Sequence, residues 1–248
     1  MKPAIRGKDL LWGLAVPLYW ILGTLRHEGS HALVGILCGA RLKEFIYWPT
    51  HWHGQFYWGY VLFDGTPPVV ATAAPYFVDV LLVLASAWVC VRWFAESRAL
   101  WINVVALGLV APTIDLTYNF IMAVVFRHAG DVVVLITALG FVLVDATFFL
   151  ALIICSASFA VVFEGRSSAP VDRHPTAQRL RATGFWLLGI NAAVLVGTFM
   201  ARAMVGAGAG PLGLMYYVSA GAFYLIALGV LTLPLLEISL LVPRRAAR

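Results

Sequence analysis

Residues 10–39 read LLWGLAVPLYWILGTLRHEGSHALVGILCG, an apolar run with one compact polar cluster in its second half. The run is longer than the ~20 residues that a helix needs to cross the hydrocarbon core of a bilayer. The whole chain is 62% hydrophobic and 12% charged, with a mean hydropathy of +0.89, which is far too apolar for a soluble domain of this length. The sequence therefore predicts a helical protein that crosses a membrane several times.

Six apolar segments are expected to span the membrane, which predicts an all-α polytopic fold. They cover residues 10–39, 68–91, 99–126, 132–163, 182–201 and 212–242. One sizeable hydrophilic stretch, residues 164–181, is rich in Arg, Ser and Pro and predicts a surface loop. This loop separates a four-span core, residues 1–163, from two C-terminal spans within residues 182–248.

Residues 42–63 differ in kind from the spans. They read LKEFIYWPTHWHGQFYWGYVLF, with aromatic and β-prone residues on both sides of a central PTHWHG turn. This pattern predicts a β-hairpin at the membrane interface, although the same aromatic residues would also suit an ordinary interfacial belt. His51 and His53 in the turn are either interfacial residues or part of a second metal site.

The polar cluster in the first span contains HEGSH, residues 27–31, which matches the pattern HExxH. Two imidazoles four residues apart lie on one face of a helix and can share a zinc ion, and Glu28 beside them can take a proton from a metal-bound water. With 6 His and 5 Glu among 248 residues, chance produces such a match in roughly 0.2% of shuffled sequences. Within a span these side chains cost several kcal/mol unless they face a partner, a metal or a water-filled cavity. The motif predicts a zinc site, and the alternative is a polar cluster at the end of a short span.

Two histidines leave zinc short of a third protein ligand, and depth along the spans selects the candidates. At ~1.5 Å per residue, His27 lies roughly 27 Å along the first span, near the face where the hairpin emerges. Asp115 of the third span reaches a similar depth, and Asn119 lies slightly closer to that face. Asp131 opens the fourth span at the same face, whereas Asp79 lies nearer the middle of the bilayer. Asp115 and Asp131 are therefore both candidates for the third ligand.

Together these residues resemble the site-two protease family of membrane zinc peptidases, over roughly residues 10–140. The segment TAAPYFVD, residues 72–79, is similar to the Ala-Gly-Pro-x-x-Asn element of that family. Asn119 and Asp131 match, in order, the ends of its Asn-x-x-Pro-x-Pro-x-x-Asp-Gly segment. The resemblance implies that Asp131 is the third zinc ligand and that Asn119 steadies the substrate or the reaction intermediate.

The sequence also departs from the family pattern. Asp79 stands in place of the Asn of the second element, and the proline pair is missing. The spacing from Asn119 to Asp131 is longer than in the family, and Asp131 is followed by Val132 instead of Gly. Asp115 therefore stays an alternative to the preferred ligand Asp131.

The resemblance implies a zinc metalloendopeptidase. His27, His31 and an aspartate would hold Zn²⁺, and Glu28 would act as general base and then as proton donor to the leaving amine. The substrate would be a transmembrane helix or a hydrophobic peptide, partly unwound, to which the hairpin adds a strand. No nucleic-acid partner is expected, because the net charge of +5 comes from basic residues in short loops and at both ends of the chain.

The distribution of Lys and Arg predicts the orientation in the membrane. Twelve lie on the face that carries both termini and four on the other face, with Arg26 inside the first span. This predicts a multi-pass protein of the plasma (inner) membrane with cytoplasmic termini and the HExxH end of the first span at the outer face. The site-two family opens its site towards the cytosol, so the side of cleavage stays open.

Two other functional classes remain. A catalytically inactive, protease-like scaffold or chaperone would be marked by an incomplete metal site. A di-iron membrane oxygenase would recruit the histidines His27, His31, His51, His53 and His128. Such oxygenases use about eight histidines with paired clusters, whereas this chain has 6 and none are adjacent. Iron in place of zinc in the purified protein would support the oxygenase.

Overall fold

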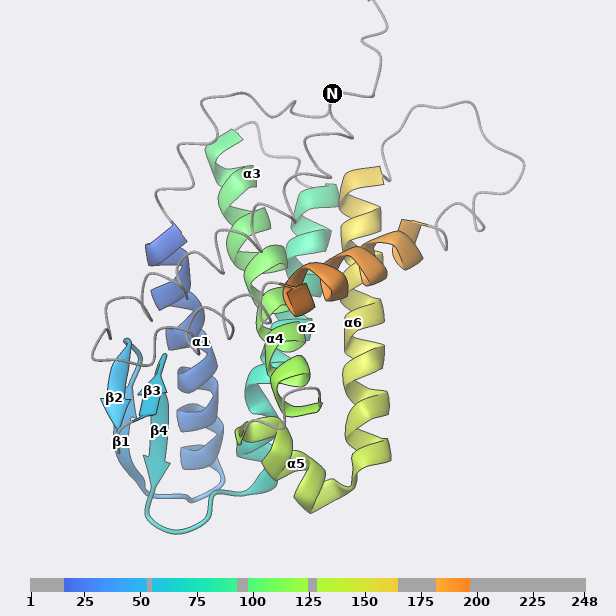
Figure 1. Ribbon diagram of the computed structural model, residues 1–248. Helices are drawn as coiled ribbons and strands as arrows, with labels where there is room; N and C mark the ends of the chain where they lie inside the picture. The colour runs from blue at the N-terminus through green and yellow to red at the C-terminus, as the bar shows by residue number, and fades with distance from the viewer. Residues whose placement is uncertain (1–15, 53–54, 93–97, 125–128, 165–181, 197–248) are drawn as a thin grey trace, which may run out of the picture.

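The computed structural model describes residues 16–52, 55–92, 98–124, 129–164 and 182–196. They form a mostly helical bundle with an antiparallel hairpin after the first helix (Figure 1). In chain order the elements are α1 (Val16–Leu37), β1 (Leu42–Ile46), β2 (Thr50–Trp52), β3 (Gln55–Tyr57), β4 (Tyr60–Phe63), α2 (Val69–Arg92), α3 (Arg98–Val105), the π-helix η2 (Ala106–Val110), α4 (Ala111–Val124), α5 (Asp131–Leu139) and α6 (Phe141–Glu164). A further helix covers Ala182–Val196.

Three helical stretches are long and apolar enough to cross a membrane: Val69–Arg92, Trp101–Val124 and Phe141–Phe163. They correspond to the second, third and fourth expected spans, and they make the chain an integral, multi-pass membrane protein. The helix α1 has 22 residues and is long enough, but Arg26 and the HEGSH motif make it more polar than these three.

The two expected C-terminal spans are described only in part. The helix Ala182–Val196 occupies most of the expected span 182–201 and is apolar, but the described helix is shorter than the three spans. The expected span 212–242 and both termini lie outside the described residues, so the predicted orientation stays a prediction.

The expected fourth span is wrong at its beginning, because a single continuous helix over residues 132–163 does not form. Gly140 has a φ of +89°, which a residue with a side chain rarely adopts, and it separates α5 from α6. An unbroken helix of this length would extend for roughly 48 Å, well beyond the hydrocarbon core. The break shortens the span to Phe141–Phe163 and leaves α5 free to turn towards α1 at the hairpin end of the bundle (Figure 1).

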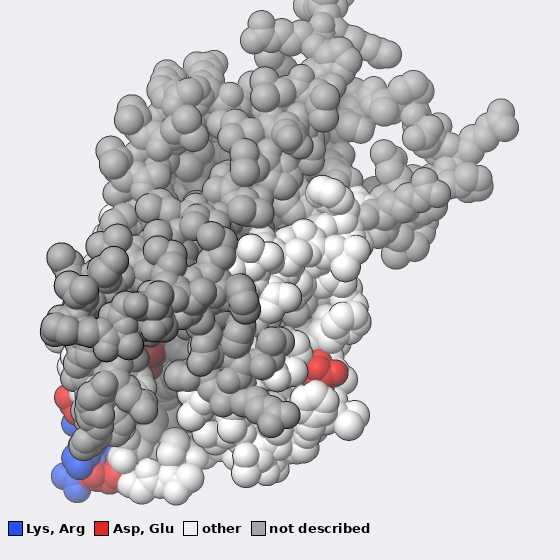
Figure 2. All heavy atoms as spheres, in the orientation of Figure 1, with Lys and Arg blue, Asp and Glu red and all other residues white. Residues whose placement is uncertain are grey.

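The helix α2 forms the centre of the bundle and packs against α1, α4 and α6. The core contains fully buried apolar side chains from several elements, among them Val83 of α2, Leu109 of η2 and Phe159 of α6. Trp186 of the helix Ala182–Val196 packs on Phe159, with ring centroids 5.2 Å apart. The described surface in Figure 2 is mostly uncharged, and charged side chains gather at the end where the hairpin lies, as expected for a bundle embedded in lipid.

The predicted hairpin over residues 42–63 is confirmed. β1 pairs with β4 and β2 with β3, both antiparallel, so the two pairs follow one another along a single long hairpin. It lies against α1: the Trp58 ring contacts Trp20, and the Phe63 ring covers Gly35 so closely that a Cβ at Gly35 would collide with it. The hairpin is therefore docked along the helix that carries the HExxH motif.

Gly59 marks the closest approach of the hairpin to the motif. A Cβ built on Gly59 would lie 2.7 Å from the Ile46 carbonyl oxygen, 2.7 Å from Thr24 Cγ2 and 2.9 Å from Glu28 Cγ. We expect Gly59→Ala to lower the free energy of unfolding by about 1–3 kcal/mol, because backbone and packed side chains must move apart. Thermal unfolding in detergent measures this effect. The matched control is Gly23→Ala, where a Cβ meets no atom within 4 Å, and equal stability of the two variants would contradict the close docking.

Candidate metal centre

The HExxH motif lies on α1, where the helical repeat places its two histidines one turn apart on the same face. The ring centroids of His27 and His31 are 5.0 Å apart, and both side chains are buried against the bundle. Glu28 is buried as well, and its side chain lies next to Gly59 of the hairpin. The motif therefore faces the protein interior and not the lipid.

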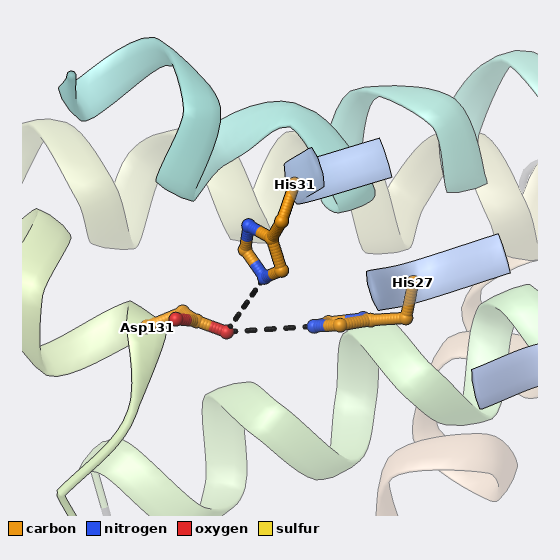
Figure 3. A group of neighbouring side chains, drawn as sticks. All are labelled: His27, His31 and Asp131. Atoms are coloured by element: carbon orange, nitrogen blue, oxygen red, sulfur yellow. Dashed lines mark hydrogen bonds and ion pairs between the residues drawn. The ribbon is translucent and has the colours of Figure 1, made fainter. Parts of the chain in front are cut away.

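Asp131, the first residue of α5, completes a compact group with the two histidines (Figure 3). Its Oδ2 atom lies 3.1 Å from His31 Nε2 and 3.4 Å from His27 Nε2, and the three candidate ligand atoms all lie within 4.8 Å of one another. The sequence separation is 100 residues for the pair His31 and Asp131. The break at Gly140 allows α5 to bring this carboxylate to α1.

The two nitrogen donors and one oxygen donor of this group are ligand types that a metal ion such as zinc accepts. Zinc prefers nitrogen and oxygen ligands at about 2.0–2.2 Å in a tetrahedral arrangement, which places neighbouring ligand atoms about 3.3 Å apart. The two short separations in the group are 3.1 and 3.4 Å. Three protein ligands would leave a fourth position for water or substrate, as in catalytic zinc sites.

The orientation of His31 is set by the backbone of α2. His31 Nδ1 lies 2.8 Å from the carbonyl oxygen of Ala71, which can only accept a hydrogen bond, so Nδ1 carries the proton. This carbonyl is available because the residue four positions later is Pro75, which has no N–H to bond it within the helix. Pro75 therefore provides the acceptor that orients His31 and leaves Nε2 facing Asp131.

The orientation of His27 is set by Asp115 of α4. His27 Nδ1 donates to Asp115 Oδ2 at 2.9 Å, on the side of the imidazole opposite Nε2. Asp115 is held in turn by Asn119, whose Nδ2 donates to Asp115 Oδ1 at 2.7 Å, and by Arg26, whose guanidinium lies 2.9 Å from Oδ2. Such carboxylate partners fix the tautomer of a metal-ligating histidine and raise its basicity.

These hydrogen bonds leave Asp131 facing two acceptor atoms. Because each Nδ1 carries its proton, the Nε2 atom of neutral His27 and of neutral His31 presents a lone pair. Both lone pairs point at the Asp131 carboxylate, which is itself an acceptor (Figure 3). The arrangement is favourable only when a cation or additional protons occupy the space between the three groups.

The charge of the surrounding cluster favours a cation. Four carboxylates, those of Glu28, Asp79, Asp115 and Asp131, lie in one cluster with the guanidinium of Arg26. Arg26 Nη2 lies 2.7 Å from Asp79 Oδ1, and the Asp79 side chain is fully buried. If all four carboxylates are ionised, three negative charges remain uncompensated in a low-dielectric interior, and a divalent cation would remove two of them.

The structure thus places the expected residues in two different positions around His27. Asp131, the preferred third ligand, lies beside both Nε2 atoms, and Asp115, the alternative, lies behind the ring at Nδ1. Asn119 contacts Asp115. Of the histidines considered for a second site or for an oxygenase, His53 and His128 lie outside the described residues, and only the backbone of His51 is described, in β2.

Sequence reasoning missed two members of the cluster. Asp79 was expected to lie too deep for the metal group, and it is the ion-pair partner of Arg26 instead. Opposite charges in two spans were the available signal for this pair. Tyr76, whose ring lies edge-on to His27 with centroids 5.7 Å apart, read as one of many aromatic residues and gave no signal.

Comparisons with protein-family models, with curated proteins and with solved structures find no match to this chain. The fold and the site therefore define the class by themselves. The chain is a multi-pass helical membrane protein in which two buried histidines and one partly exposed aspartate form a group that could hold a metal ion.

Proposed function

We propose that this chain is an intramembrane zinc metallopeptidase, of the kind that the resemblance to the site-two protease family implies. The observation that carries the proposal is the convergence of two imidazole lone pairs and one carboxylate at zinc-like separations, next to the glutamate of an HExxH motif. No shared ancestry is needed for this inference, because it rests on the chemistry of His27, His31, Asp131 and Glu28.

The reaction would be hydrolysis of a peptide bond. A zinc ion bound by the group would polarise the substrate carbonyl and lower the pKa of a water molecule at its open position. Glu28 would accept a proton as the water oxygen attacks the carbonyl carbon, and would deliver a proton to the amine nitrogen as the C–N bond breaks. Asp115 would keep His27 in the required tautomer, and the Ala71 carbonyl would do the same for His31.

The proposed substrate is a transmembrane helix or hydrophobic peptide with an unwound segment, because a helical backbone cannot bring its carbonyl to a buried site. The hairpin offers a means of holding such a segment. Its described sheets have two strands each, so their outer edges have no partner strand among the described residues. β4 begins directly after Gly59, which contacts Glu28, so a strand added to this sheet would lie near the proposed base.

The metal content of detergent-purified protein tests the proposal. We expect about one zinc per chain in the wild type, and loss of this zinc in His27→Ala and in Asp131→Ala. Asp115→Ala is expected to retain zinc with an affinity about 10- to 100-fold lower, because Asp115 acts behind the ligand. Elemental analysis and zinc titration give both quantities. Absence of zinc in the wild type would refute the proposal, and iron in its place would favour an oxygenase. If zinc is lost completely in Asp115→Ala but kept in Asp131→Ala, then Asp115 is the third ligand and Asp131 is not.

A further inference from the structure

Peptide hydrolysis is accelerated by a hydrogen-bond donor at the place where the carbonyl oxygen becomes negative, in addition to the polarisation that a metal ion supplies. Asn119 was expected to supply it, but its side-chain nitrogen already donates to Asp115 Oδ1 at 2.7 Å and approaches the Asp115 carbonyl oxygen at 3.0 Å. These contacts lie behind His27, on the side away from Asp131. Among the described residues, another donor is better suited to the oxygen.

The hydroxyl of Tyr76 is that donor. Tyr76 follows Pro75 on α2, is 6% exposed, and its oxygen is buried without a hydrogen-bond partner among the described residues. Leaving a buried hydroxyl unpaired costs about 1–3 kcal/mol, so such a group calls for an explanation. The explanation is that the hydroxyl forms its hydrogen bond only when a substrate is bound.

The Tyr76 ring packs directly against the candidate metal group. The ring is edge-on to His27 at 5.7 Å and edge-on to Phe148 of α6 at 4.8 Å, so it is held from two sides. Tyr76 is therefore a rigidly packed neighbour of the candidate metal ligand His27, and its hydroxyl is a buried group without a described partner.

We propose that Tyr76 is a catalytic residue whose hydroxyl donates a hydrogen bond to the oxyanion formed on the substrate carbonyl. The inference rests on the proposed peptidase function and adds a residue to it. The phenol keeps its proton throughout, so no proton balance changes. The segment 71–76 of α2 then has two roles at the site. The Ala71 carbonyl, left free by Pro75, orients His31, and Tyr76 supplies the oxyanion donor.

Tyr76→Phe in the full-length, zinc-loaded protein tests this inference through ligand affinity as well as through rate. The probes are an apolar peptide phosphonamidate, whose tetrahedral phosphoryl oxygen imitates the oxyanion, and a hydroxamate of the same sequence, which binds zinc without a tetrahedral centre. We expect the phosphonamidate affinity to fall about 10- to 100-fold and the hydroxamate affinity to change by less than about threefold. Cleavage of a single-span helix carrying a central Gly-Pro is expected to lose about 10²- to 10³-fold in kcat with little change in KM.

The matched control is Tyr19→Phe, which removes a buried hydroxyl that donates to Asn103 at 2.7 Å, and it is expected to keep both affinities. Zinc content of Tyr76→Phe should equal that of the wild type and its melting temperature should be no lower, because the hydroxyl has no described partner to lose. Wild-type phosphonamidate affinity in Tyr76→Phe would overturn the inference while leaving the peptidase proposal intact. Loss of zinc in Tyr76→Phe would also overturn it, in favour of a packing role beside His27. A wild-type protein without zinc would refute the proposed function itself.

Discussion

Glu28→Gln is expected to leave about one zinc per chain and to lower the rate of peptide cleavage by about 10²- to 10⁴-fold, the usual contribution of a general base. Glutamine has nearly the same size and can occupy the same buried position against Gly59, but it cannot accept the proton from the attacking water. The measurement combines elemental analysis with cleavage of single-span helices in liposomes, read by mass spectrometry. Retained zinc would show that the loss of rate comes from the missing base and not from a collapsed site.

Glu44→Gln is the control for this variant. Glu44 lies on β1 and accepts a hydrogen bond from the Tyr60 hydroxyl at 2.8 Å, away from the two histidines, so its replacement should preserve cleavage. A Glu28→Gln protein that retains zinc and its full biological role would contradict the peptidase proposal. That outcome would favour the inactive, protease-like scaffold or chaperone.

Arg26→Met is expected to lower the free energy of unfolding by about 3–5 kcal/mol, because it leaves the Asp79 carboxylate buried without its charge partner. Arg26 Nη2 lies 2.7 Å from Asp79 Oδ1 and 2.9 Å from Asp115 Oδ2, so one guanidinium serves two carboxylates inside the bundle. Unfolding of the purified protein in detergent, followed by circular dichroism, measures the effect. Zinc affinity should fall as well, since Asp115 positions His27.

The double variant Arg26→Met with Asp79→Leu distinguishes loss of the ion pair from loss of packing. Replacement of both charges by apolar groups should recover most of the lost stability, because the Asp79 charge is then absent and Asp115 keeps its hydrogen bonds from His27 and Asn119. The matched control, Arg41→Met, breaks the Arg41 and Asp64 pair at 3.6 Å, whose side chains are 86% and 52% exposed, and should cost at most about 1 kcal/mol. If Arg26→Met costs no more than this control, the buried network is not a stabilising feature of the fold.

The spans and the hairpin could be predicted from the sequence because each leaves a local pattern. Residues 69–92, 101–124 and 141–163 are predominantly apolar over the thickness of a bilayer, and this requirement is independent of the rest of the fold. Residues 42–63 contrast with them by their aromatic, β-prone composition around one turn.

The break at Gly140 could not be predicted, because hydropathy does not distinguish a continuous apolar helix from two apolar helices joined at a glycine. Single glycines occur within many membrane helices, so this one gave no warning of its positive φ. The break also concerns the site, because Asp131 is the first residue of the separate helix α5 and lies 3.1 Å from His31.

Only the two histidines of the candidate site could be predicted from the sequence. The spacing of His27 and His31 places them on one face of α1 whatever the tertiary fold. The choice between Asp131 and Asp115, by contrast, depends on which nitrogen of His27 each carboxylate meets, and this is a tertiary distance. The orienting role of the Ala71 carbonyl required knowledge that α1 and α2 lie side by side.

The sequence separation of the metal group has a consequence for folding. A zinc ion that joins His31 to Asp131 would close a loop of 100 residues, in the manner of a reversible covalent cross-link between the start of α5 and the middle of α1. Because the unfolded chain does not hold the three ligands together, the free energy gained on binding is added to the stability of the whole enclosed segment. In the proposed enzyme, the hairpin, α2 and α4 would thus be held together by the same ion that performs the chemistry.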